Sequence, residues 1–190
     1  MSFLNNLLHY LVVGGMKDKF DFSEFKVVYK SNKDLTELEI KSIINLKSQY
    51  WNYSYDMQRS WMIKNLNEND FHLWIENSSH EIIAYMNHVF VECFHNDKHE
   101  NMIGIGNVCV SPLYTSRGLG KLLMHISSFY ISENSLNAIL LCKDDLRSFY
   151  LKSGWKLFEG NVMINSEKFD KNLFTLHEIQ ASALFLNRNF

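Results

Sequence analysis

The chain has 190 residues, of which 46% are hydrophobic and 14% aromatic, a composition typical of one compact globular domain. Its 19 Lys and Arg residues stand against 21 Asp and Glu residues, giving a formal net charge of −2. This balance excludes a nucleic-acid binder that works through bulk positive charge, and it excludes an acidic disordered tail. Four of the 8 glycines and the single proline lie between Gly104 and Gly120, so the search for function starts there.

The first residues of the chain are apolar but carry no Lys or Arg between Met1 and Gly15. A secretory signal has a basic start, so we expect residues 1–24 to form an N-terminal extension or docking helix before a domain over residues 25–190. No stretch approaches 18 consecutive apolar residues, so no membrane helix is predicted. Cys93, Cys109 and Cys142 each lie in an apolar run, which predicts buried thiols in a reducing, cytoplasmic compartment.

The sequence of the first half of the domain predicts a strand, two helices and two more strands. Residues 25–29 are rich in β-forming side chains. Asp34 is the expected N-cap of the first helix, with Glu37 at the capping-box position, and residues 56–66 form the second helix. Between the helices lies an aromatic segment with Tyr50, Trp51, Tyr53 and Tyr55. Strands over residues 71–76 and 81–94, separated by a Ser-Ser turn, predict an antiparallel hairpin.

The sequence of the second half of the domain predicts two strands that are joined by a crossover helix. A strand over residues 101–110 is stopped by Pro112, and a helix over 118–132 leads to a short buried strand over 138–142. A helix over 146–152 ends at Gly154, and strands over 155–158 and 173–177 complete the sheet. The predicted fold class is α/β (α+β): a single domain with a mixed, mostly antiparallel sheet of six or seven strands and about four helices.

The glycine-rich turn is a candidate anion site. A strand runs through this turn into a helix, whose first N–H groups are unsatisfied and point at one place. Gly118 and Gly120 remove Cβ atoms that would keep a diphosphate away, and Arg117 and Lys121 add positive charge. The spacing fits neither GxxxxGK[ST] nor GxGxxG. A glycine turn that only connects strand to helix remains the alternative if this segment is considered alone.

A second motif, some thirty residues later, favours a binding site. Phe149-Tyr150 is followed by Gly154-Trp155, and residues 115–120 match the pattern [Q/R]-x-x-G-x-[G/A] at both glycines, with Thr115 at its first position. The two motifs and the order of elements over residues 25–178 resemble the GCN5-related N-acetyltransferase (GNAT) family. The segment from Arg147 to Trp155 is also loosely similar to aminoglycoside 2′-N-acetyltransferases.

The resemblance implies an acetyl-CoA-dependent N-acetyltransferase that uses no metal. The pantetheine arm would bind the main chain of one strand, while Gly104 and Gly106 would form a bulge that bends this strand away from its neighbour. The pyrophosphate would bind the glycine loop. The residues expected to hold acetyl-CoA are Val108, Cys109, Val110, Thr115, Ser116, Arg117, Gly118, Leu119, Gly120 and Lys121.

For the chemistry, the resemblance assigns Tyr150 as the general acid that protonates the leaving thiolate, and a main-chain N–H near Val108 or Cys109 could stabilise the oxyanion. The family's strand carboxylate is missing, so the general base stays open among Glu92, His95 and His88. A helix tyrosine that only packs on the sheet is the alternative for Tyr150.

The acceptor is expected to be a primary amine of a small molecule or peptide. Trp51, Tyr53 and Tyr55 could bind it, or could simply fill the core. Residues 181–190 could fold near that pocket or form a homodimer contact; neither a nucleic acid nor a membrane is an expected partner. The rival hypothesis is a non-catalytic acyl-CoA-binding or interaction protein of the same fold, suggested by Thr115 and the missing carboxylate.

Overall fold

The computed structural model describes residues 24–165, 167–168, 172–177, 179 and 181–188. The described chain divides into two compact units, one formed by residues 24–87 and 107–130, the other by residues 88–106 and 131–188. Two long strands, β3 (Ile82–His95) and β4 (Lys98–Val110), contribute residues to both units. The predicted extension over residues 1–24 lies, apart from its last residue, outside the described residues.

In the first unit, β1 (Lys26–Ser31) pairs antiparallel with β2 (Phe71–Glu76), with Lys26 opposite Glu76 and Ser31 opposite Phe71. Strand β2 also pairs with β3, as the Ser-Ser turn predicted. At the end of β4, the N–H of Ser111 donates to the main-chain oxygen of Ile83 at 2.7 Å. The last residues of β4 are therefore hydrogen-bonded to β3.

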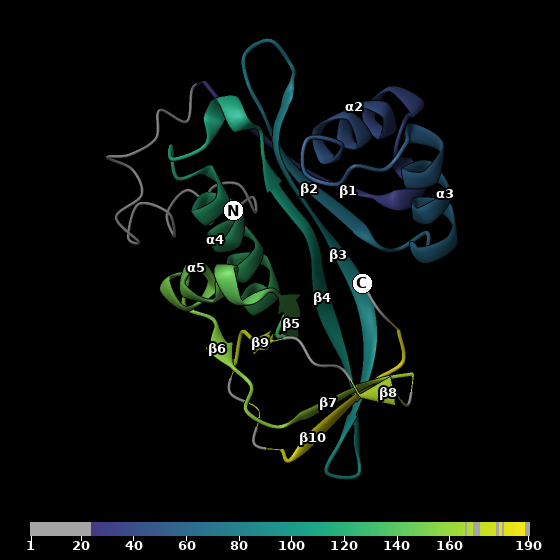
Figure 1. Cartoon of the computed structure of the whole chain (residues 1–190), viewed down its shortest axis with the longest axis vertical. Coiled ribbons are helices and arrows are strands. Elements are labelled where there is room, and N and C mark those ends of the chain that lie inside the picture. Colours follow the sequence, from purple (N-terminus) through teal and green to yellow (C-terminus); the bar gives the residue numbers. More distant parts are fainter. Residues whose placement is uncertain (1–23, 166, 169–171, 178, 180, 189–190) are drawn as a thin grey trace. The chain divides into compact units, whose positions relative to one another are not determined.

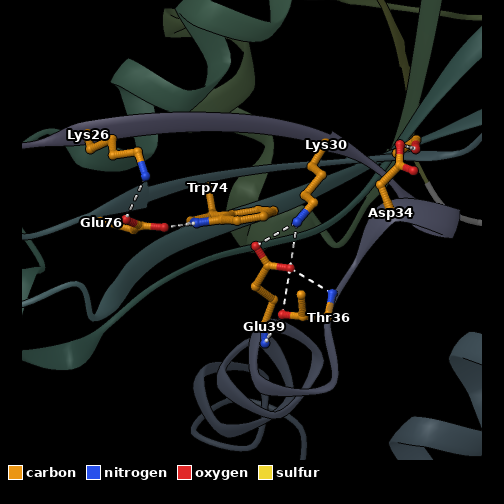
Figure 2. A network of polar contacts seen from close by, with 8 residues as sticks. Lys26, Lys30, Asp34, Thr36, Glu39, Trp74 and Glu76 are labelled. Atoms are coloured by element: carbon orange, nitrogen blue, oxygen red, sulfur yellow. Dashed lines mark hydrogen bonds and ion pairs between the residues drawn. The ribbon is translucent and has the colours of Figure 1, made fainter.

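Helix α2 (Glu37–Lys47) begins at Thr36, so the prediction of Asp34 as its N-cap is wrong. Thr36 and Glu39 form a capping box: Glu39 N–H donates to Thr36 Oγ1, and Thr36 N–H donates to Glu39 Oε2 at 2.7 Å (Figure 2). Lys30 on β1 adds an ion pair to Glu39 at 2.8 Å. Asp34 lies instead in the 3-10 turn η2 (Asn32–Asp34), where its carboxylate accepts a hydrogen bond from the Ser31 hydroxyl.

Figure 2 shows a second polar group beside this one, in which Glu76 of β2 accepts from Trp74 Nε1 at 2.8 Å and pairs with Lys26 of β1 at 3.4 Å. Both groups use acidic and basic side chains to connect β1 to its neighbours. The main support of the unit is apolar: Ile43 and Leu46 of α2 pack with Trp74, Tyr85 and Cys109 in one buried cluster.

Helix α3 (Tyr55–Asn65) is capped by the Ser54 side chain, which accepts from the N–H of Met57 at 3.2 Å. After β4, the 3-10 turn η3 (Pro112–Tyr114) leads through a short loop to α4 (Leu119–Glu133). The predicted helices over 56–66 and 118–132 are confirmed within one residue at each end. Their apolar spacing was the reliable signal, because it acts within a single helix.

In the second unit, β3 and β4 are joined by a tight turn at Asn96 and Asp97, whose φ angles are 49° and 58°. Two left-handed central residues define the turn type that suits a two-residue hairpin. Strand β5 (Asn137–Cys142) runs parallel to β4, from Met102 opposite Asn137 to Ile105 opposite Leu140, which confirms the predicted crossover through a helix.

The chain then forms η4 (Asp144–Leu146) and α5 (Arg147–Lys152). Gly154, at φ 88°, ends α5 in the left-handed conformation that its place after the helix predicts. Strands β6 (Lys156–Leu157) and β9 (Asn172–Thr175) pair antiparallel, and β9 also pairs antiparallel with β5. These two strands confirm the last two strand predictions.

Three further strands were not predicted: β7 (Asn161–Ile164), β8 (Glu167–Lys168) and β10 (Ala183–Leu186). Strand β10 runs parallel to β7, beside it in Figure 1, and pairs antiparallel with β3 at Phe185 and Leu186. Ten strands thus form a mixed, mostly antiparallel sheet in the described residues, which confirms the fold class with more strands than expected.

The three cysteines are free and buried, as their apolar surroundings predicted. Within the described ranges, no helix has both the length and the apolar character needed to cross a membrane.

Candidate active site

The loop between η3 and α4 is exposed from Thr115 to Gly118. Two of its residues have left-handed backbone, Ser116 at φ 63° and Gly118 at φ 82°. The helix ladder starts where the N–H of Leu122 donates to the oxygen of Gly118 at 2.9 Å. The N–H groups of Leu119, Gly120 and Lys121 precede that bond, so they have no acceptor within the helix and lie at its positive end. This is the construction expected of a phosphate site.

Two side chains of the loop are held by local contacts. The Thr115 hydroxyl donates to the main-chain oxygen of Pro112 at 3.0 Å. The guanidinium of Arg117 lies over the ring of Tyr114, 5.0 Å from its centroid. Thr115, which departs from the family pattern, therefore closes the turn, while the Arg117 cation lies over Tyr114 in the segment that precedes α4. The loop therefore combines main-chain donors with a positive charge, as an anion site requires.

The left-handed backbone of Asn107 indicates a bulge in β4 next to Gly106, and the prediction of a bulge is wrong at Gly104. Gly104 stands in regular register opposite Ile139, whereas Asn107 has φ 54°, and asparagine is one of the few non-glycine residues that adopt this conformation readily. The Asn107 side chain donates to Asn87 Oδ1 at 2.9 Å. The last pair between β4 and β5 is Ile105 with Leu140, two residues before the bulge.

After the bulge, β4 presents main-chain groups on one edge. Because Ser111 N–H faces β3, strand alternation turns the N–H of Cys109 toward β3 as well, and turns those of Val108 and Val110 to the opposite edge. The Cys109 side chain is part of the buried cluster, and burial raises the pKa of its thiol to about 12, despite the nearby Lys47. Cys109 is therefore an inert thiol, and Val108 and Val110 carry the accessible main-chain groups.

The aromatic segment lies mainly at the surface. Tyr53 is 57% exposed and Tyr55 38%, which is more than a core role predicts, whereas Trp51 packs against the buried cluster. The Tyr50 hydroxyl donates to the main-chain oxygen of Val110. The first unit thus connects the aromatic segment directly to the strand residues that are expected to bind pantetheine.

Tyr150 belongs to the second unit, where α5 positions it. It is 5% exposed and packs edge-on against Phe149, with ring centroids 5.0 Å apart, and near Phe174, at 5.9 Å. Burial, and then the neighbouring Cys142, raise the pKa of its phenol. Tyr150 is consequently a neutral phenol at every physiological pH, the form that a general acid requires.

The three candidate bases have different surroundings in the second unit. Glu92 is exposed and accepts from the Asn187 amide at 3.1 Å. His95 pairs with Glu100 at 3.1 Å, and His88 is fully buried. In the part of the chain that the structure describes, no cluster of three or more His, Cys, Asp or Glu side chains could hold a metal ion.

Two residues of the first unit escaped the sequence analysis. Asn107 could have been found as an asparagine directly after the glycines of a strand. Lys47 is only 4% exposed. Its burial could have been predicted from the sequence, because Lys47 follows the apolar Ile40, Ile43 and Ile44 at helical intervals and so lies on the same face of the helix. Burial lowers the pKa of Lys47 to about 8, an effect that the Cys109 thiol partly opposes.

A buried histidine lies close to this lysine. Both ring nitrogens of His72 form hydrogen bonds. Nδ1 lies 2.7 Å from the Tyr85 hydroxyl, and Nε2 lies 3.1 Å from Asn32 Oδ1. Asn32 Oδ1 can only accept, so His72 carries its proton on Nε2 and accepts from Tyr85 at Nδ1. Burial, assisted by Lys47, lowers the pKa of His72 to about 4, so the imidazole is neutral.

Comparison with solved structures shows the same fold in several proteins. An acyl-CoA N-acyltransferase from Pseudomonas aeruginosa is 17% identical, with a TM-score of 0.58, over 80% of this chain and 99% of that one. YhbS from Escherichia coli, a GNAT family N-acetyltransferase in complex with CoA, is 11% identical, with a TM-score of 0.62, over 85% of this chain and 89% of that one. A GNAT family acetyltransferase from Staphylococcus aureus is 13% identical, with a TM-score of 0.55, over 80% of this chain and 100% of that one.

A search of curated proteins by sequence gives no significant match. The model of the acetyltransferase (GNAT) family matches residues 40–155, which include β4, the glycine loop, α4 and α5. Proteins of the GNAT family bind CoA and acetylate amines. The chain belongs to the acetyltransferase (GNAT) family and is an acyltransferase.

Proposed function

We propose that this acyltransferase moves the acetyl group of acetyl-CoA to a primary amine of a small molecule or peptide by direct attack. The observation that carries the proposal is the loop before α4, with left-handed Ser116 and Gly118, N–H groups at the helix start that have no acceptor within the helix, and the cation of Arg117 in the same loop. In this proposal the loop holds the pyrophosphate, with Thr115 closing the turn behind it.

The main chain of β4 then binds the pantetheine arm. Val108 and Val110 direct N–H groups away from β3, so an extended ligand can add along this edge as a further strand would. The Tyr50 hydroxyl already occupies the oxygen of Val110, which leaves the N–H groups as the accessible partners there. The Val108 N–H is the candidate donor to the carbonyl oxygen as negative charge develops on it.

A thioester carbonyl is already activated, so a neutral amine attacks it once both are held in a near-attack arrangement. The enzyme must then remove a proton from the amine and supply one to the departing thiolate. Tyr150 is proposed as the donor of the second proton, because its buried phenol stays protonated. The role requires the phenol to reach the thioester sulfur. Glu92 stays a candidate for the first proton, with Trp51, Tyr53 and Tyr55 as candidate acceptor contacts.

The test is release of free CoA thiol from acetyl-CoA across a panel of primary amines, together with calorimetric measurement of CoA binding. We expect CoA to bind and thiol release to depend on the amine. Tight CoA binding with no thiol release from any amine would contradict acetyl transfer and favour a non-catalytic acyl-CoA-binding protein. Absence of CoA binding would contradict the role of the loop.

A further inference from the structure

Asn87 is a buried amide in the middle of β3. It is 1% exposed, and Met86, His88 and Val89 around it are fully buried. The Asn87 Nδ2 atom is buried and has no hydrogen-bond partner within the ranges that the structure describes. A buried donor without an acceptor lowers the free energy of unfolding, and an apolar side chain at this position would avoid that loss. The amide therefore needs an explanation other than stability.

The other end of this amide forms a contact between strands. Asn87 Oδ1 accepts a hydrogen bond from Asn107 Nδ2 at 2.9 Å. Asn87 lies on β3 and Asn107 on the neighbouring β4, and both residues belong to the first unit. The Asn107 side chain is thus attached to a partner that is itself enclosed by the core.

The main chain of Asn107 is left-handed, with φ 54°. This conformation is unfavourable for a residue with a Cβ atom, whereas glycine adopts it without that cost. Glycine is present at positions 104 and 106 of the same strand, yet the left-handed position carries an asparagine. The side chain is therefore informative: its bond to Asn87 stabilises the main-chain conformation that directs it toward β3.

The conformation of Asn107 sets the direction of the next N–H group. The peptide group between Asn107 and Val108 is planar, so the Val108 N–H turns with the ψ angle of Asn107. Bulges re-aim strand groups in this way beside active sites. Pairing with β5 ends at Ile105 opposite Leu140, so the ladder with β5 does not fix this peptide group. Asn87 thus acts, through the Asn107 side chain, on the direction of the Val108 N–H.

We infer that Asn87 is a positioning residue for acetyl transfer. Through its hydrogen bond to Asn107 it holds the left-handed main chain of β4, and so aims the Val108 N–H at the carbonyl oxygen of the bound thioester. The inference rests on the proposed function, in which this N–H stabilises the oxyanion, and it adds a residue that touches neither substrate nor cofactor. No bond to Asn87 forms or breaks in the reaction.

The first experiment observes the Val108 N–H without turnover. Protein labelled with ¹⁵N-valine is saturated with CoA or with acetyl-CoA in the absence of any amine, and the Val108 resonance is identified by its loss in Val108→Ile. Only acetyl-CoA offers this N–H a carbonyl oxygen at the reacting end, so we expect a larger downfield shift of the amide proton with acetyl-CoA than with CoA. Asn87→Val should lose this difference. A wild type without the difference, or a variant that keeps it, would overturn the inference.

The second experiment measures kcat and KM by thiol release, with an amine that the panel identifies. Asn87→Val should lower kcat at least tenfold, which is part of the roughly 100- to 1,000-fold that removal of an oxyanion donor costs. The KM for the amine and the dissociation constant of CoA should change less than twofold, because Asn87 touches neither ligand. An unchanged kcat, or a rise in KM and in the dissociation constant as large as the loss of kcat, would contradict a positioning role.

A change of the left-handed residue itself provides the decisive comparison. Asn107→Gly keeps the conformation without a side chain, so kcat should stay within about threefold of the wild type. Asn87→Val in the Asn107→Gly background should then lower kcat by less than a further twofold. An effect of Asn87→Val that is equally large in both backgrounds would show that Asn87 does not act through Asn107, and the inference would be wrong.

Asn107→Ala tests the same point if Asn87→Val does not fold, because position 107 is only half-buried. Alanine opposes the left-handed conformation, so it should lower kcat at least tenfold where glycine spares it. Asn165→Ala is the matched control, because Asn165 of the second unit is exposed and has φ 49°. It carries the same main-chain penalty and should keep the wild-type kcat and the acetyl-CoA shift. Equal kcat in Asn107→Ala and Asn107→Gly, or an equal loss in Asn107→Ala and Asn165→Ala, would overturn the inference.

The outcomes separate this inference from the proposed function. Thiol release that is unaffected by Asn87→Val would overturn the positioning role and leave acetyl transfer standing. An acetyl-CoA shift that depends on Asn87, without thiol release from any amine, would support the positioning of the Val108 N–H and contradict acetyl transfer.

Discussion

The Tyr50 hydroxyl donates a hydrogen bond to the main-chain oxygen of Val110, 60 residues further along the chain. The contact connects the segment between α2 and α3 to the edge of β4 that is not paired with β3. It also connects the two halves of the proposed site within the first unit, because the aromatic segment is the candidate acceptor side and β4 the candidate thioester side.

Tyr50→Phe should weaken acceptor binding. The substitution keeps the ring but removes one hydrogen bond, which is worth about 1 kcal/mol, or roughly a fivefold change in an equilibrium constant. We expect the KM for the amine to rise by about that factor, with the dissociation constant of CoA changed less than twofold, as measured by thiol release and calorimetry. An unchanged KM would mean that the segment is positioned without this contact.

Gly118→Ala should abolish most CoA binding. Gly118 has φ 82°, a conformation that costs a residue with a Cβ atom about 1–2 kcal/mol, and the loop depends on it to present its N–H groups. Calorimetry should show a dissociation constant for CoA at least tenfold higher than that of the wild type.

Gly154→Ala is the matched control for this loop variant. Gly154 has φ 88°, and no atom lies within 4 Å of an added Cβ, so the substitution brings the same backbone strain at the end of α5. Both variants should lose similar stability in urea denaturation, and only Gly118→Ala should lose CoA. Equal CoA affinity in the two variants would remove the loop from the binding site.

Tyr150→Phe should depress turnover and spare cofactor binding. Removal of a general acid typically lowers the rate 100-fold or more. Because the leaving group is a thiolate, which depends less on protonation, we expect a loss at the lower end of this range, about 100-fold in kcat. The ring still packs against Phe149 and Phe174, so the thermal midpoint should shift little. Thiol release and CoA calorimetry check this, and unchanged turnover would mean that Tyr150 is a packing residue.

Lys47→Met should stabilise the protein at neutral pH. The pKa of Lys47 is about 8 in the folded chain, against an ordinary value of 10.5. While the side chain is charged, it therefore lowers the free energy of unfolding by about 3 kcal/mol. The unfolded chain binds more protons than the folded one between pH 8 and 10.5, so the stability of the wild type rises over this range relative to the variant.

Urea denaturation of both proteins at pH 7, 8.5 and 10 measures this difference. We expect the advantage of Lys47→Met to be largest at pH 7 and to shrink as the pH rises from 8 toward 10.5. A difference that does not depend on pH would show that the ammonium is compensated in the folded chain.

Local signals in the sequence were enough for most elements, and they also support the loop proposed for the cofactor. The helical spacing after Gly118, the glycine that ends α5 and the Ser-Ser turn between β2 and β3 act over a few residues, so each could be read directly. The glycine loop was found in the same way, because an anion site at a helix start needs only neighbouring residues. The Thr36 cap was missed because two capping patterns overlapped, and only one could start α2.

Tertiary structure decided the rest. The bulge lies at Asn107 because the strand register keeps Gly104 regular, and register depends on partners far along the chain. Strand β10 forms because Ala183–Leu186 pairs with β7 and β3, which no local pattern contains. Lys47 reads as an ordinary lysine near the end of a helix, and only the packing of α2 with Trp61 of α3 buries most of its side chain. The sequence by itself was enough to propose where a CoA diphosphate binds, since the proposed loop is local; the proposed acceptor side depends on residues that come together only in the folded chain.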